Sequence, residues 1–64
     1  MNYQIYINGS ATKGVYDTFE EAKNVANQFM DNGESPDLEI KASDNLNPVV
    51  KWKYDYQITQ WVEQ

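Results

Sequence analysis

The first residues of the chain alternate between apolar and polar side chains, which is the pattern of a strand with one buried face. Tyr3, Ile5 and Ile7 form the apolar side, and mostly polar residues lie between them. The turn-forming residues 8–10 follow, and residues 15–17 form a short second strand that is able to pair back as a hairpin. We therefore expect the chain to begin with a β-hairpin.

A helix is predicted from Phe19 onward. Thr18 and Glu21 have the spacing of a capping box, in which both side chains satisfy free backbone N–H groups at a helix start. Gly33 and Pro36 are helix stop signals. Between these limits the apolar residues recur at helical spacing, so one face of the helix packs and the other meets water. The apolar stripe comprises Phe19, Ala22, Val25, Ala26, Phe29 and Met30.

Two further strands are predicted in the C-terminal half. Alternation at residues 38–42 gives one strand, residues 44–48 turn the chain back, and a longer alternation at residues 50–58 gives the other. The last strand is then longer than the usual ~5–6 residues, and its neighbour covers only its first half. We expect the second half to pair elsewhere or to leave backbone groups open, with residues 59–64 as an interaction tail.

This order of elements predicts an α+β fold, a ββαββ two-layer sandwich with one helix on a small antiparallel sheet. No internal repeat or linker is visible, so residues 1–64 are interpreted as a single domain. One helix covers one face of the sheet, and the other face must be polar or covered by a partner. Trp52, Tyr54 and Tyr56 have the parity of Val50 and are expected under the helix.

The composition restricts how so short a chain is stabilised. A domain of 64 residues is near the lower limit for independent folding, and this one has neither cysteine nor histidine for disulfides or zinc. Aromatic residues make up 14% of the sequence and supply the core. The N-terminus lacks a signal-peptide pattern, and no apolar run is long enough to span a bilayer, so we expect a cytoplasmic protein.

The charge argues against nucleic acid and membranes as partners. The formal net charge is -5 and all five basic residues are lysines. Phosphate backbones and anionic lipids are repelled, and without arginine there is no bidentate donor for phosphate. The ten carboxylates raise the alternative that the protein imitates DNA. Their dispersion among the lysines favours an ordinary solvated surface.

The residue types that carry most enzymatic chemistry are missing. Without histidine or cysteine the usual general base and the strongest nucleophile are absent, and a chain this small hardly encloses a deep cleft. Residues 44–47 offer oxygen ligands but lack the glycine and the distal glutamate of a calcium loop, so they are interpreted as a turn. The sequence predicts no enzyme, no cofactor and no metal site.

The residues most suited to binding a partner are aromatic or basic and lie outside the predicted core. Exposed tyrosine and tryptophan are typical of interface hot spots. Three groups meet this description: tyrosines of opposite parity to their apolar neighbours, lysines on the outer sheet face, and apolar residues beyond the sheet. They are Tyr6, Tyr16, Lys51, Lys53, Trp61 and Val62. The alternative is that the aromatic members cap the edge of the core.

The leading hypothesis is a small acidic binding module that inhibits or adapts a larger host protein through a sheet face or edge. In size, acidity and lack of catalytic residue types the chain resembles the small accessory proteins with which bacteriophages and mobile elements bind and block a host protein. This resemblance is one of type and rests on no particular residues. The alternatives are a structural homo-oligomer, such as a dimer, joined through the last strand and tail, and a DNA-mimic inhibitor of a nucleic-acid enzyme.

Overall fold

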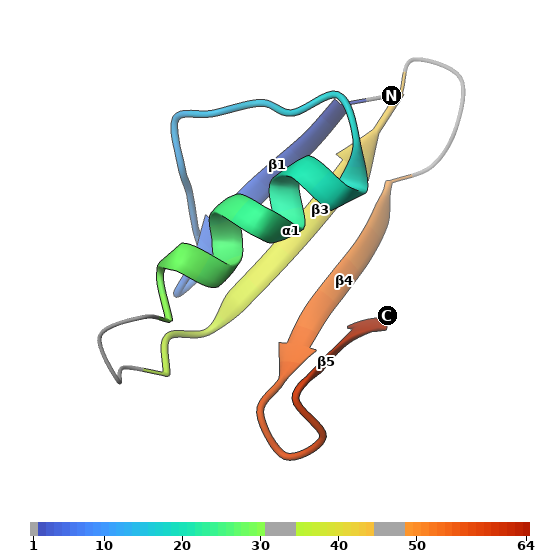
Figure 1. Ribbon diagram of the computed structural model, residues 1–64. Coiled ribbons are helices and arrows are strands. Elements are labelled where there is room, and N and C mark those ends of the chain that lie inside the picture. The colour runs from blue at the N-terminus through green and yellow to red at the C-terminus, as the bar shows by residue number, and fades with distance from the viewer. Residues whose placement is uncertain (1, 31–34, 45–48) are drawn as a thin grey trace.

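A computed structural model describes residues 2–30, 35–44 and 49–64. Within these residues the chain forms one helix and a five-stranded antiparallel sheet (Figure 1). The elements are β1 (Asn2–Ile7), β2 (Ser10–Ala11), α1 (Phe19–Gln28), β3 (Leu38–Ser43), β4 (Val50–Asp55) and β5 (Gln60–Glu63). The predicted α+β class is confirmed. The predicted order ββαββ is not, because a fifth strand follows β4.

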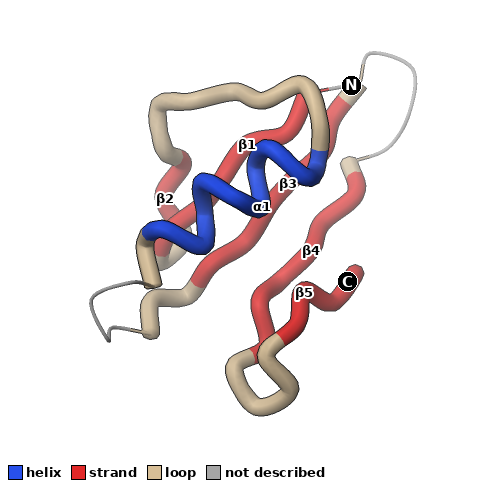
Figure 2. Tube along the Cα trace, in the orientation of Figure 1, coloured by secondary structure: helices blue, strands red, loops and turns tan. Residues whose placement is uncertain are grey.

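The strand order across the sheet is β2-β1-β3-β4-β5, so β1 and β3 are neighbours although the helix separates them in the chain. The helix lies over β1 and β3, and the β4–β5 hairpin extends to one side of it (Figure 2). Ile5, Ile40 and Trp52 are direct partners across three strands and therefore point to the same face. This face, which α1 covers in part, is the helix side of the sheet.

The core lies between α1 and the two central strands. Its buried members are Ile5, Ile40, Ala22 and Ala26. The two alanines are short, which allows the helix backbone to come close to the sheet. Larger side chains close the rim of this cluster without being fully buried. They are Tyr3, Ile7, Tyr16, Phe19, Val25, Trp52 and Trp61.

The helix start is confirmed at the predicted residue. Thr18 has an extended backbone, and its side chain accepts a hydrogen bond of 3.2 Å from the backbone N–H of Glu21. The predicted apolar stripe holds for its first members, but Phe29 is 41% exposed. The helix ends at Gln28 and Phe29 is its C-cap, so the stripe no longer follows helical spacing there. The stop signal Gly33 lies outside the described residues. No helix in the described part of the chain is long and apolar enough to cross a membrane.

The first hairpin differs from the prediction in the position of its second strand. Asn8 and Gly9 have φ angles of 52° and 87°, which turn the chain at once into β2 at Ser10. The predicted strand at residues 15–17 contributes only an isolated bridge, in which Tyr16 exchanges two backbone hydrogen bonds of 2.8 and 2.9 Å with Tyr3.

The prediction of one long strand at residues 50–58 is wrong. β4 ends at Asp55, whose carboxylate accepts a hydrogen bond of 2.9 Å from the backbone N–H of Gln57 and so initiates a turn. Thr59, at φ 53°, completes the turn, and β5 pairs back onto β4. The supposed tail is thus the edge strand of the sheet, and the open second half of a long strand does not exist.

Candidate functional site

The face of the sheet opposite the helix carries most of the predicted binding residues. The strand register aligns Tyr6 with Glu39, Glu39 with Lys53, and Lys53 with Val62, so these side chains form one row across four strands. A neighbouring row aligns Gln4, Lys41 and Lys51. We call this surface the open face. Its members include Gln4, Tyr6, Glu39, Lys41, Lys51, Lys53, Asp55 and Val62.

Two lysines stand directly opposite each other on the open face. Lys41 and Lys51 are cross-strand partners, and like charges in this position are unfavourable. Lys41 places its Nζ 4.0 Å from the centre of the Tyr6 ring, which compensates part of this repulsion through a cation–π contact. Lys51 is exposed and has no ion pair among the residues that the structure describes.

The third lysine of the open face is paired. Lys53 Nζ lies 3.5 Å from Asp37 Oδ1, and both side chains are 49% exposed, so the pair adds little to stability. Within the described residues Lys41 and Lys51 thus have no ion pair, and Glu39 is the acidic residue of the neighbouring row.

A hollow of about 400 Å³ adjoins the open face at the β4–β5 turn. Lys53, Tyr56 and Val62 are among its lining residues. The Tyr56 hydroxyl donates a hydrogen bond of 2.5 Å to the Pro36 carbonyl. Burial, and after it the neighbouring Tyr54 and Asp37, raise the pKa of Tyr56. The hydroxyl thus stays protonated, and the hydrogen bond ties the turn to the start of β3.

The structure does not bring Tyr16 and Trp61 onto the open face. Both pack against the core from the helix side. Trp61 is the cross-strand partner of Tyr54 and is half-buried, and Tyr16 is held against Tyr3. Their part in binding stays a prediction, but they cannot share a surface with Tyr6, Lys51, Lys53 and Val62.

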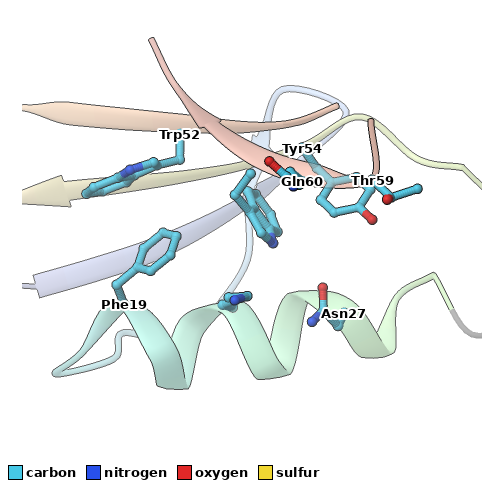
Figure 3. A pocket seen from close by; sticks show the side chains of 8 residues that line it. Phe19, Asn27, Trp52, Tyr54, Thr59 and Gln60 are labelled. Atoms are coloured by element: carbon cyan, nitrogen blue, oxygen red, sulfur yellow. The ribbon is translucent and has the colours of Figure 1, made fainter. Parts of the chain in front are cut away.

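Sequence reasoning missed a groove on the helix side. It lies between α1 and the β4–β5 hairpin and has a volume of about 490 Å³ (Figure 3). We call it the aromatic groove. Its lining residues are Phe19, Lys23, Asn27, Trp52, Tyr54, Thr59, Gln60 and Trp61. Strand parity assigned Trp52 and Tyr54 to a closed core. The sequence did contain an indication of this groove, because one short helix cannot cover the whole width of the predicted sheet.

Within the described residues, no group of three or more His, Cys, Asp or Glu side chains is placed to hold a metal ion. No family model matches the chain, and no curated protein or solved structure matches it either. Function must therefore be inferred from the surfaces themselves.

Proposed function

We propose that this protein is a small non-enzymatic binding module, an inhibitor or adaptor of a larger host protein, and that it attaches through the open face. The observation that carries the proposal is the row of Tyr6, Lys53 and Val62 on a face that the helix does not cover. An aromatic and an apolar residue in line with charged ones, on a sheet face that the helix leaves uncovered, are typical of interfaces.

Charge indicates what the partner presents to this face. Lys41 and Lys51 repel each other across the strands, and a carboxylate placed between them would remove that repulsion. At the other end, the hollow beside Lys53 and Val62 has room for an apolar side chain. We therefore expect a protein surface with an acidic residue near one apolar anchor.

The size of the molecule is compatible with this mode of binding. A standard interface buries about 800 Å² on each partner. The chain exposes 4459 Å², so such an interface would occupy roughly a fifth of its surface. A host protein would contact this face without disturbing the core on the helix side.

The test compares two charge reversals. Lys51→Glu changes the open face, and Lys13→Glu makes the same change in the exposed loop before Tyr16. Proteins retained from a host extract by the wild type are identified by mass spectrometry, and the affinity of the purified partner is measured by calorimetry. We expect Lys51→Glu to weaken binding about tenfold or more and Lys13→Glu to leave it unchanged. Equal affinities for both variants would contradict the proposal.

Self-association is a second candidate, and the edge of the sheet favours it. β5 pairs with β4 on one side only, and a free strand edge is a template for another strand. Val62 in this strand is 36% exposed, and Ile58 in the preceding turn is 52% exposed. Sedimentation over a range of concentrations tests it. A dimer that Val62→Lys abolishes would support the homo-oligomer, and a monomer at all concentrations would exclude it.

A further inference from the structure

We propose that the aromatic groove binds a small aromatic carboxylate, with the ring of the ligand against the aromatic walls and its carboxylate near Lys23. This site is separate from the open face, because the groove lies on the helix side of the sheet.

The walls of the groove present aromatic rings from both layers of the fold. Phe19 rises from the helix toward Trp52 of the sheet, and their ring centres are 4.6 Å apart (Figure 3). On the hairpin, the rings of Tyr54 and Trp61 meet edge to face at 5.2 Å. Such rings favour a flat apolar guest, which stacks or meets them edge to face.

The charge of the lining selects an anion. Lys23 is the basic residue of the groove, and its lining contains no carboxylate, although the chain has ten acidic residues and five basic ones. Lys23 is half-buried and has no ion pair within the described part of the chain. The other polar lining residues, Asn27, Thr59 and Gln60, are neutral. A carboxylate in the groove therefore meets one lysine and no acidic residue among the lining residues, and Glu63, the cross-strand partner of Trp52, lies outside the lining.

An unsatisfied donor supports the same ligand chemistry. Trp61 Nε1 is buried and has no hydrogen-bond partner among the residues that the structure describes. An indole N–H is a donor only, and leaving a buried donor unpaired is unfavourable. An oxygen acceptor on a ligand would satisfy it once the side chains that cover the indole nitrogen move aside.

The dimensions of the groove suit a small molecule. Its volume of about 490 Å³ lies within the range of small-ligand pockets, ~300–1,000 Å³. The groove is open on one side, so the ligand stays partly in water and we expect modest affinity.

The experiment titrates the full ¹⁵N-labelled chain with phenylacetate and with phenylacetamide, its neutral isostere, and follows the indole N–H signals by NMR. We expect phenylacetate to bind about tenfold more tightly than the amide and to shift the Trp61 indole proton downfield. Lys23→Met removes the charge and keeps the apolar stem. It should weaken phenylacetate binding about tenfold and leave the amide unaffected. Lys13→Met is the matched control and should change neither.

Equal binding of acid and amide, or an unchanged affinity in Lys23→Met, would overturn the proposal. So would the absence of any shift with phenylacetate or with the larger indole-3-acetate. If Lys23→Met perturbs signals far from the groove, Lys23→Gln replaces it. An acidic peptide is titrated in the same way. If it alone shifts the indole N–H signals, the groove belongs to a protein partner and the small-molecule site is overturned.

Discussion

The two faces of the sheet differ in what their residues contribute, although the same strands build both. In β3, Ile40 is fully buried under the helix, while its neighbour Lys41 lies on the open face. Burial of an apolar side chain stabilises the fold by about 1.5–3 kcal/mol, whereas the half-buried Lys41 contributes mainly through its contact with the Tyr6 ring. The comparison teaches that the buried apolar side chains of the helix side contribute most of the stability, while the residues of the open face contribute less.

Deleting residues 59–64 should have the largest effect on stability. The deletion removes β5 and with it Trp61, whose ring lies edge to face 6.4 Å from Phe19. We expect a loss of about 3 kcal/mol or more, because a large aromatic side chain and a strand disappear together. Thermal unfolding followed by circular dichroism measures it. A midpoint equal to that of the full chain would mean that β5 is an accessory tail, as the sequence predicted.

Ile40→Ala and Lys51→Ala test the comparison between the faces most directly. Ile40 is at the centre of the core cluster, so its truncation should cost about 2–5 kcal/mol. Lys51→Ala should change stability by no more than about 0.5 kcal/mol. Denaturant unfolding gives both values. Similar losses for the two variants would show that the open face is packed against something.

Thr18→Ala should cost about 1 kcal/mol, because it removes the hydrogen bond that caps the helix. This change tests the two sheet faces separately, since it weakens the helix that covers one face and leaves the sheet itself unchanged. Thr18→Ser retains the hydroxyl and serves as the control. If both variants unfold at the wild-type denaturant concentration, the cap does not stabilise the helix.

Lys51→Glu should stabilise the fold slightly, by about 0.5 kcal/mol at low salt. It turns the repulsive pair of Lys41 and Lys51 into an attractive one, and the gain is small because the site is exposed. The gain should disappear in high salt. The same substitution is expected to weaken partner binding, so a variant that is more stable and binds less would identify the open face as the recognition surface.

Raising the pH should give the smallest effect. The pKa of Tyr56 is raised above its ordinary value of 10.0, so the fold favours the protonated hydroxyl that donates to Pro36. This contribution is fully present below pH 10.0 and is lost as the pH rises through the raised pKa of the folded protein. As the pH is raised from neutral to high values, the thermal unfolding midpoint should fall less steeply in Tyr56→Phe than in the wild type. An identical decline in both proteins would contradict this role.

Local signals in the sequence determined the parts of the fold that depend on neighbouring residues. The alternation around Ile5 and Ile40 gave the central strands and their buried face, and Thr18 with Glu21 gave the helix start. The same parity placed Lys51, Lys53 and Tyr6 on the outer face. Each of these features arises from backbone geometry within a few residues, and a single sequence records it.

The tertiary structure alone decided where the last strand turns and what the helix leaves uncovered. Alternation continues from Val50 to Ile58 through the turn, so it does not mark where β4 ends. That turn brings Trp61 back beside Tyr54 and, together with the position of α1 over β1 and β3, forms the aromatic groove. Parity reports the face on which a side chain lies, but the distance between layers and the reach of a helix depend on packing across the whole chain.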